Sequence, residues 1–249
     1  MNIRFIVQAR LQSLRLPEKV LADIGGYTLL QHIIKRLRKI DSVQFSTLFA
    51  IPKESSNKLQ DYFNQNQIQY IEGSNSDVMS RFLTASEDLN DNDYVVRLTA
   101  DNPFLDYECA NFVLKKLKNS QADLIYPWKL PLGMGFEIIR TGALRDQREH
   151  SLEPHHFEHV STYIKENREQ YKVQKIDYID NRSDIRLTVD EAADLEQVKK
   201  TYDYFVTRNK PYFTSVDICK LHADKPSFFT INKKVAQKTP TSYEKESFQ

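Results

Sequence analysis

The N-terminal segment constrains this chain most, because an apolar run there is followed by a basic loop and a periodic helix. Residues 3–7 have the composition of a buried strand. Pro17 punctuates the loop, and leucine and isoleucine recur at helical spacing over residues 29–37. Ligands of open α/β sheets bind where strands end, and guanidinium and ammonium groups form charge-assisted hydrogen bonds with phosphate oxygens. The segment therefore predicts the triphosphate-binding opening of a nucleotide-type α/β fold. The loop side chains suited to this are Arg10, Ser13, Arg15 and Lys19.

Strand and helix patterns continue to alternate, which favours a mostly parallel sheet flanked by helices. The loop or hairpin predicted at residues 127–135 contains two prolines and two glycines. Ser76 or Asp77 is suited to cap a helix that carries Val78 and Phe82 inward. The other predicted strands cover residues 45–51, 68–71, 93–98, 122–126, 136–139, 171–178 and 186–189. The other predicted helices cover residues 54–64, 107–119, 142–148 and 155–167, and two more begin near residues 190 and 214.

Length and charge narrow the class of protein. A chain of 249 residues fits one large domain, predicted at residues 1–225. Residues 226–249 are polar with little apolar periodicity, and we expect a flexible tail there. The net charge of +1 argues against a nucleic-acid or membrane-surface protein. No apolar run approaches the ~18 residues of a membrane span, so we expect a soluble, cytoplasmic protein. Two cysteines make no disulfide framework, and Cys109 is expected to be buried.

Two aspartates follow predicted strands and are candidates for a metal site. Asp101 comes after the strand at residues 93–98, where it would face the basic loop. Mg²⁺ prefers one or two carboxylates together with phosphate and water oxygens, so Asp101 suits a partial ligand. It suits equally a cap for the following turn or for the helix near Asp106. Asp190 ends the strand predicted at residues 186–189. The nearby Glu191 and Asp194 fit the first turn of a helix, where acidic residues are favoured.

Three charged positions keep two interpretations each. Arg97 lies inside a predicted strand and would contact either a phosphate or a buried carboxylate. Glu137 lies among apolar neighbours, where it would be either an exposed position of an edge strand or a functional acid. Asp77 and Arg81 are four residues apart and would form a surface ion pair on one helix face, unless Arg81 faces a ligand.

The histidine-rich segment at residues 155–159 invites a metal interpretation. His155 and His159 are four residues apart and could share one ion. However, the segment lacks the His-Glu-x-x-His pattern and no distant third ligand is evident, so zinc is not expected. His155 and His156 are instead expected to face solvent or a second copy of the chain.

Four segments of the chain form a specific set of motifs: Ala9-Arg10-x-x-Ser13-x-Arg15-Leu16-Pro17-x-Lys19, residues 96–106 (VRLTADNPFLD), residues 158–163 (EHVSTY) and residues 186–195 (RLTVDEAADL). Together they resemble the CMP-KDO synthetase-like cytidylyltransferases, and most of all their spore-coat polysaccharide (SpsF-type) branch. They occur in the family's order over roughly residues 3–200, and together they are far more specific than any one alone. The sequence departs from the family pattern at Gln12, Glu18 and Ala100, where glycine is common. Glu18 would place a negative charge beside the expected phosphates.

The resemblance implies a GT-A-like (Rossmann-like) nucleotidyltransferase fold with a hairpin-containing dimerisation and acceptor region near residues 127–180. It implies an enzyme that transfers CMP from CTP to a sugar acid, sugar or related small molecule, with Mg²⁺ and release of pyrophosphate. Arg15, Lys19 and Asp101 would be catalytic, and Asp101 and Asp190 would hold the metal. The implied nucleotide-binding residues are Ala9, Arg10, Ser13, Arg15, Lys19, Arg81 and Asp101. The implied acceptor-binding residues are Glu137, Glu158 and His159.

Two other classes of protein stay open. A GT-A glycosyltransferase would share the sheet and the carboxylates, but it normally has an Asp-x-Asp pair, whereas this sequence has Asp101-Asn-Pro. A non-catalytic nucleotide-binding protein of the same fold is favoured only by Gln12 and Glu18. Joint binding of Mg²⁺ and a nucleoside triphosphate separates these alternatives. Neither the acceptor nor the base preference follows from the residues alone.

Overall fold

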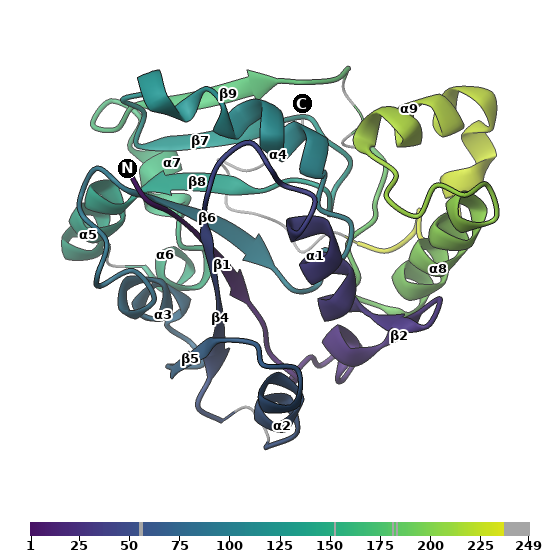
Figure 1. Cartoon of the computed structure of the whole chain (residues 1–249), viewed down its shortest axis with the longest axis horizontal. Coiled ribbons are helices and arrows are strands. Elements are labelled where there is room, and N and C mark those ends of the chain that lie inside the picture. Colours follow the sequence, from purple (N-terminus) through teal and green to yellow (C-terminus); the bar gives the residue numbers. More distant parts are fainter. Residues whose placement is uncertain (55–56, 152, 181, 183, 237–249) are drawn as a thin grey trace.

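The computed structural model describes residues 1–54, 57–151, 153–180, 182 and 184–236. In this part of the chain, seven strands form one twisted sheet in the order β5-β4-β1-β6-β8-β7-β9 (Figure 1). β8 runs antiparallel to its neighbours, and the other pairings are parallel. The predicted mixed, mostly parallel sheet is therefore confirmed. The strands are β1 (Ile3–Gln8), β4 (Ser46–Pro52), β5 (Tyr70–Gly73), β6 (Tyr94–Thr99), β7 (Leu124–Trp128), β8 (Glu137–Arg140) and β9 (Val173–Asp177), with a separate hairpin of β2 (Asp23–Ile24) and β3 (Tyr27–Thr28).

Helices cover both faces of the sheet, because the central strands are apolar on both sides. Phe5 and Val7 of β1 pack in the cluster that includes α1, α2 and α4, whereas Ile6 packs with α3, α5 and α7 on the opposite face. The helices are α1 (Leu29–Leu37), α2 (Asn57–Gln65), α3 (Val78–Thr84), α4 (Tyr107–Leu114), α5 (Thr141–His150), α6 (Pro154–His159), α7 (Thr162–Glu166), α8 (Ala192–Val206) and α9 (Ser215–Asp224), with short 3₁₀ turns η1 (Lys19–Leu21), η2 (Leu117–Asn119) and η3 (Pro226–Phe229).

The strand order changes direction beside β1. From β1 the chain moves outward to β4 and β5, then returns to β6 on the other side of β1. The loops that follow β1 and β6 therefore begin at neighbouring strand ends, because Gln8 lies opposite Thr99 in the register. Ligands of open α/β sheets bind at such a switch point, outside the carboxyl ends of the strands. The fold thus places the basic loop and the Asp101 loop side by side.

Two predicted elements differ from the structure. Residues 186–189 do not form a strand of the sheet, and Arg186 makes one isolated bridge to Leu132. The helix predicted at residues 155–167 is divided into α6 and α7 by Val160, whose φ is 52°. The helical pattern of the sequence is similar on both sides of Val160, so the pattern alone does not predict the break between α6 and α7.

A third apolar cluster joins the β2–β3 hairpin to α8 and α9. The C-terminal residues that the structure describes also pack there: Phe228 and Phe229 contact this cluster, and Asn232 is buried. The predicted end of the domain at residue 225 and the flexibility of the tail stay predictions, and residues 237–249 lie outside the described residues. Within the described residues, no helix is long and apolar enough to cross a membrane.

Candidate nucleotide-binding site

The ammonium group of Lys19 is the centre of the charged site. Lys19 lies in the η1 turn after the basic loop and is only 7 % exposed. Its Nζ lies 3.1 Å from Asp101 Oδ2, 2.8 Å from Asp190 Oδ1 and 2.7 Å from the Val189 carbonyl oxygen. Three acceptors match the three protons of an ammonium group. Both predicted metal-binding aspartates therefore converge on one cation.

A backbone hydrogen bond brings the two aspartates together. The Val189 N–H donates to the Asp101 carbonyl oxygen at 2.9 Å, so the segment before Asp190 is fastened to the loop after β6. The same segment is tied to the loop after β7, where the Leu187 N–H donates to the Leu132 carbonyl oxygen at 2.7 Å. Gly133 permits this close approach, because its φ is +98° and a side chain there would meet the backbone of Leu187.

Asp190 is held by several cations. Arg15 lies 3.3 Å from its carboxylate and Arg186 lies 2.8 Å from it, in addition to Lys19. Burial would raise the pKa of Asp190, but the hydrogen bond and charge of Lys19, with the charges of the arginines, hold the pKa below its usual range. Arg186 also pairs with Asp194 at 2.8 Å, which is fully buried. The acidic cluster is therefore a neutralised network and not only a helix cap.

Other residues of the predicted loop have distinct roles in its shape. Ala9 is buried, and its N–H donates to the Ala50 carbonyl oxygen at 3.1 Å, which fixes where the loop leaves β1. The Ser13 hydroxyl accepts a hydrogen bond from the Leu16 N–H at 3.4 Å. Arg10 is half-exposed, and its guanidinium lies 3.9 Å from the carboxylate of Glu158. The loop thus brings one predicted nucleotide-binding cation next to a predicted acceptor-side acid.

The two departures from the family pattern in this loop have a structural account. Glu18 has φ 56°, in the left-handed region that glycine adopts without strain. Its carboxylate pairs with Lys58, which lies on α2, so the extra negative charge has a partner. Gln12 donates a hydrogen bond to the Glu54 carbonyl oxygen at 3.3 Å. The backbone shape typical of glycine is thus retained at position 18 despite the larger side chain.

Arg81 and Asp77 do not form the predicted surface ion pair with one another. The Asp77 carboxylate caps α3 by accepting from the Ser80 N–H at 2.9 Å, and it pairs with Arg148 at 2.8 Å. Arg81 is buried and donates to the Ala50 carbonyl oxygen at 3.2 Å. Burial and the nearby charge of Arg10 lower the pKa of Arg81 to about 10. Arg81 therefore lies close beneath the basic loop.

Asp106, and not Asp101, caps the helix that follows β6. The Asp106 carboxylate accepts hydrogen bonds from the N–H groups of Glu108 and Cys109 at the start of α4. Asp101 thereby stays available to the charged site, where Lys19 contacts it. The interpretation of Asp101 as the cap of this helix is therefore wrong, and its role as a metal ligand stays a prediction.

Glu137 is part of a second charged group, next to the first in the sheet. It begins β8, an internal strand, so the interpretation as an exposed edge-strand residue is wrong. Its side chain is 14 % exposed, lies 2.8 Å from Arg97, pairs with Lys165 and accepts from the Ser161 hydroxyl at 2.8 Å. Burial would raise the pKa of Glu137, but Lys165 and Arg97 lower it to about 2. Arg97 is thus the partner of a buried carboxylate, one of the two alternatives predicted for it.

A cavity of about 250 Å³ adjoins this group. It lies beside Thr99 at the end of β6, two residues before Asp101. The loop between β7 and β8 forms much of its wall. Its polar and aromatic lining includes Arg97, Asn102, Tyr126, Trp128, Glu137 and Lys165. Four of these residues were not predicted from the sequence: Asn102, Tyr126, Trp128 and Lys165. The four-residue spacing of Ser161 and Lys165 was the available signal, but nothing local indicated that both face Glu137.

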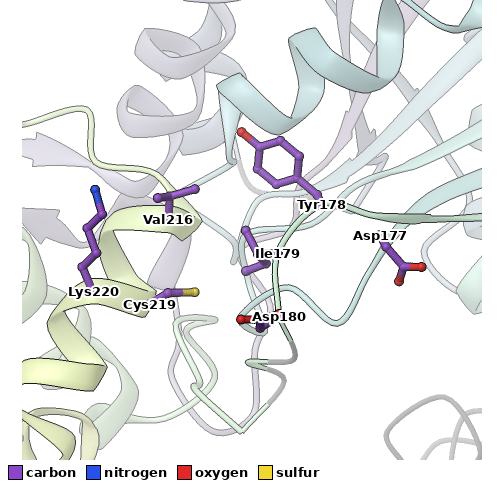
Figure 2. A pocket seen from close by; sticks show the side chains of 7 residues that line it. All are labelled: Asp177, Tyr178, Ile179, Asp180, Val216, Cys219 and Lys220. Atoms are coloured by element: carbon purple, nitrogen blue, oxygen red, sulfur yellow. The ribbon is translucent and has the colours of Figure 1, made fainter.

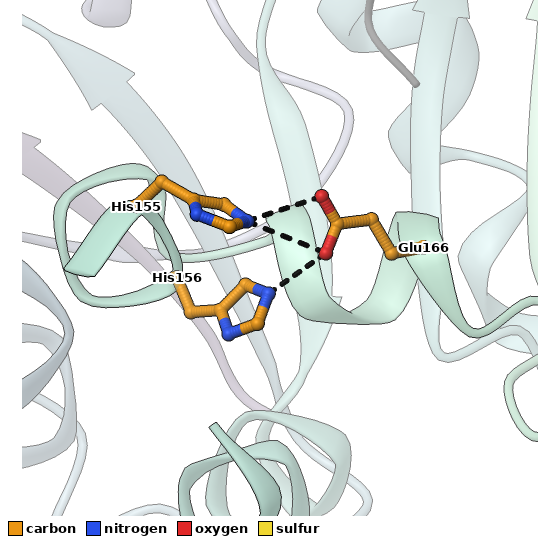
Figure 3. A group of neighbouring side chains, drawn as sticks. All are labelled: His155, His156 and Glu166. Carbon is orange, nitrogen blue, oxygen red and sulfur yellow. Dashed lines mark hydrogen bonds and ion pairs between the residues drawn. The ribbon is translucent and has the colours of Figure 1, made fainter. Parts of the chain in front are cut away.

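The histidine-rich segment does not bring His155 and His159 to one site, but places His155 beside His156. His155 and His156 both direct Nε2 toward Glu166, at 3.2 and 2.7 Å, and Figure 3 shows the two rings on one side of this carboxylate. His156 is buried, so the expectation that it faces solvent is wrong. Its Nδ1 lies 3.3 Å from the Glu153 N–H and accepts that bond, which leaves the ring proton on Nε2 to donate to Glu166. His159 is exposed at the end of α6 and lies outside this group.

A larger hollow, of about 500 Å³, lies elsewhere, between the segment after β9 and α9. Figure 2 shows the Cys219 thiol directed from α9 toward Ile179, whereas the Asp177 carboxylate points away from it. The described residues that line this hollow include none of the predicted site residues. Size alone therefore does not mark the site.

The fold and this charged site together define a nucleotidyltransferase-type α/β protein. Residues 4–247 match the family model described as cytidylyltransferase, and the chain belongs to that family. It is 31 % identical over 208 residues to the spore coat polysaccharide biosynthesis protein SpsF of Bacillus subtilis, covering 81 % of this chain and 86 % of that protein.

Solved structures agree with this assignment. A cytidylyltransferase from Leptospira borgpetersenii has a TM-score of 0.82 and 26 % identity, covering 97 % of this chain and all of that one. The CMP:2-keto-3-deoxy-manno-octonic acid synthetase solved with CTP has a TM-score of 0.65 and 14 % identity, covering 82 % of this chain and 99 % of the other. At that identity the second likeness concerns the fold alone.

Proposed function

We propose that the protein transfers CMP from CTP to a small hydroxylated acceptor with release of pyrophosphate. One observation carries this proposal: the basic loop after β1 and the carboxylate after β6 meet at the switch point of the sheet, beside a separate cavity. The basic loop and the carboxylate suit a triphosphate, and the cavity suits a second substrate. Membership of the cytidylyltransferase family supports cytosine as the base.

Arg10, Ser13 and Arg15 are the residues we assign to the triphosphate. Arg10 is half-exposed and Arg15 is about one-third exposed, so both guanidinium groups are accessible to an incoming anion. Arg15 contacts the carboxylates of Asp190 and Glu191 in the free protein. Phosphate oxygens would compete with these carboxylates for Arg15, and Lys19 would keep its place between the aspartates and the leaving pyrophosphate.

Asp101 and Asp190 would hold a magnesium ion through the carboxylate oxygens that Lys19 does not contact, since Lys19 bonds only Asp101 Oδ2 and Asp190 Oδ1. When bound, Mg²⁺ would neutralise charge on the phosphates and favour their alignment. The reaction itself forms one bond, from the acceptor oxygen to the α-phosphorus, and breaks the bond from that phosphorus to the pyrophosphate oxygen, while the proton of the acceptor hydroxyl passes to solvent or to the departing pyrophosphate. The side chains of this chain mainly position and neutralise the reactants.

The acceptor is assigned to the cavity beside Glu137. Glu137 stays ionised and neutralises only part of the charge of Arg97 and Lys165, so the wall retains a positive charge that suits a sugar acid. Glu158 and His159 lie on α6, and the contact of Glu158 with Arg10 supports a place for α6 beside the nucleotide. The name of the Bacillus subtilis relative supports a role in surface polysaccharide synthesis. A homodimer through residues 127–180 and a cytoplasmic location remain part of the proposal.

Thermal unfolding with CTP, UTP, GTP or ATP, each with and without Mg²⁺, tests this function without an acceptor. A ligand at about 100 times its dissociation constant stabilises the folded state by about 2.7 kcal/mol. We expect the largest shift in melting temperature with CTP and Mg²⁺, and its loss in Asp101→Ala. A larger shift with another base would keep nucleotidyl transfer and change the substrate. No shift with any triphosphate would overturn the proposal in favour of a protein that has lost nucleotide binding.

A further inference from the structure

Two buried polar atoms of the cavity beside Glu137 have no partner among the residues that the structure describes. They are the Tyr126 hydroxyl and the Asn102 side-chain oxygen, and both residues line this cavity. Tyr126 is 8 % exposed. A buried polar group without a hydrogen bond costs about 1–3 kcal/mol, and folded proteins rarely leave one so. Other unpartnered buried side-chain atoms occur elsewhere in the described part of the chain, but these two lie at one cavity, where a bound ligand or water would supply the missing hydrogen bonds.

The chemistry of the two atoms restricts that ligand. Burial raises the pKa of Tyr126 to about 12, so its hydroxyl keeps its proton and can donate at neutral pH. The Asn102 oxygen can only accept. A ligand that satisfies both atoms must therefore present a donor to Asn102, and either an acceptor or a donor to Tyr126. Hydroxyl groups do both, and the rings of Tyr126 and Trp128, 6.1 Å apart, add an apolar wall for carbon-bound hydrogens.

The position of Asn102 connects the cavity to the reaction. Asn102 directly follows Asp101, whose carboxylate contacts Lys19 in the charged site. A ligand hydrogen-bonded to Asn102 would lie next to the charged site to which the triphosphate is assigned. On the other side, Lys165 lies over the Tyr126 ring with its Nζ 5.3 Å from the ring centroid, while it pairs with Glu137. Tyr126 is thus fixed between the charged group and the cavity.

We propose that Tyr126 and Asn102 are positioning residues that bind hydroxyl groups of a polyhydroxylated acceptor and discriminate against acceptors that lack them. This inference rests on the proposed nucleotidyl transfer and assigns its second substrate to two residues. Neither residue needs to exchange a proton with the reacting atoms. Their contribution is the orientation of the acceptor oxygen toward the α-phosphorus.

The first test needs no acceptor and compares the stability of two tyrosine variants. Tyr126→Phe removes a hydroxyl without a partner, so the melting temperature should stay the same or rise. Tyr94→Phe is the matched control, because Tyr94 is also buried but its hydroxyl donates to the Ser120 carbonyl oxygen at 3.3 Å. Tyr94→Phe should therefore lower the melting temperature. An equal loss in both variants would overturn the inference, since the Tyr126 hydroxyl would then have a partner in the free protein.

The second test measures pyrophosphate release from CTP with a panel of free sugars, hexuronic acids, longer-chain sugar acids and sugar phosphates. With the best acceptor, Tyr126→Phe and Asn102→Ala should lower kcat/KM about 10- to 100-fold, the effect of one lost hydrogen bond to a buried group. Tyr94→Phe should leave kcat/KM within about twofold. The CTP-induced thermal shift should be unchanged in all three variants, which separates a failure of this inference from a failure of nucleotide binding.

Deoxy analogues of the best acceptor complete the test. The analogue that lacks the hydroxyl bound by Tyr126 should lose activity with the wild-type protein but lose little more with Tyr126→Phe. Wild-type kcat/KM in Tyr126→Phe, or additive losses with every deoxy analogue, would overturn the role of Tyr126. A CTP-induced shift without turnover of any hydroxylated compound in the panel would overturn the assigned acceptor class.

Discussion

The ammonium nitrogen of Lys19 lies 2.8 Å from the carboxylate of Asp190, although 171 positions separate the two residues in the sequence. This contact joins the loop after the first strand to a segment that follows the last strand of the sheet. It also means that the free protein already holds a cation between its two candidate metal-binding aspartates. Lys19 thus neutralises the site before any nucleotide binds.

Lys19→Ala should reduce turnover by about 10²- to 10³-fold, since removal of one preorganised charge that stabilises a transition state has effects of this size. The fold should persist, because Asp190 keeps its contacts with Arg15 and Arg186. Steady-state kinetics with circular dichroism checks both points. The control is Lys116→Ala, which removes an exposed lysine near the end of α4 and should change turnover less than twofold. Near-normal turnover of Lys19→Ala would remove Lys19 from the mechanism.

Glu137 should stabilise the protein at neutral pH and lose that effect in acid. Its pKa in the folded state, about 2, is below the usual glutamate value of 4.5, so the unfolded state binds more protons between these values and stability rises with pH there. The stability difference between wild type and Glu137→Gln should therefore shrink by about 2 kcal/mol from pH 7 to pH 3. Urea unfolding at both pH values measures it.

Glu196→Gln is the control for this experiment, because Glu196 is exposed on α8. Its stability difference from wild type should change little over the same pH range. A Glu137→Gln difference that is constant with pH would show that Glu137 is not held ionised by Arg97 and Lys165.

Position 18 should prefer glycine for a backbone reason. Glu18 has φ 56°, and a left-handed conformation costs a residue with a side chain about 1–2 kcal/mol more than it costs glycine. Glu18→Gly should therefore unfold with a free energy about 1 kcal/mol higher than Glu18→Ala. Both variants lose the pair with Lys58, so the comparison isolates the backbone. Equal stabilities by urea unfolding would contradict this account.

The two cysteines should differ in reactivity. Cys109 is fully buried, whereas Cys219 is partly exposed beside the hollow at α9, and burial raises the pKa of both thiols. A thiol reagent at pH 8 should modify Cys219 slowly in the folded protein and reach Cys109 only after unfolding. Mass spectrometry of the labelled chain identifies the modified residue. In Cys219→Ser, label on the folded protein would mean that Cys109 is accessible after all.

The strand, basic loop and helix at the N-terminus were predictable because their signals are local. Apolar runs mark strands such as β1 and β4, and helical spacing marks α1, since each depends only on neighbouring residues. The buried state of Cys109 followed from the same kind of pattern. The motifs that resemble the family also stand in the printed sequence, and the matching family model agrees with them.

The partners of the charged residues were decided by tertiary structure. Arg97 could not be assigned to phosphate or carboxylate until β8 was placed beside β6, because the antiparallel register sets Arg97 opposite Glu137. Residues 186–189 resemble a strand locally, yet they form no strand of the sheet. Instead, the N–H groups of Leu187 and Val189 donate hydrogen bonds to the carbonyl oxygens of Leu132 and Asp101. The burial of His156 likewise depends on tertiary structure, because its ring packs against Tyr163 and contacts Glu166, both on the next helix.

The sequence by itself therefore determined the kind of fold, the basic loop and the carboxylates available to it. Only the tertiary structure decided that Lys19 meets Asp101 and Asp190, and that the Tyr126 hydroxyl and the Asn102 side-chain oxygen have no hydrogen-bond partner in the described part of the chain. The physical reason is the distance along the sequence between the residues that interact. Periodicity and turn chemistry report interactions over a few residues, whereas these contacts depend on strand order and on backbone hydrogen bonds between loops that are far apart in the chain.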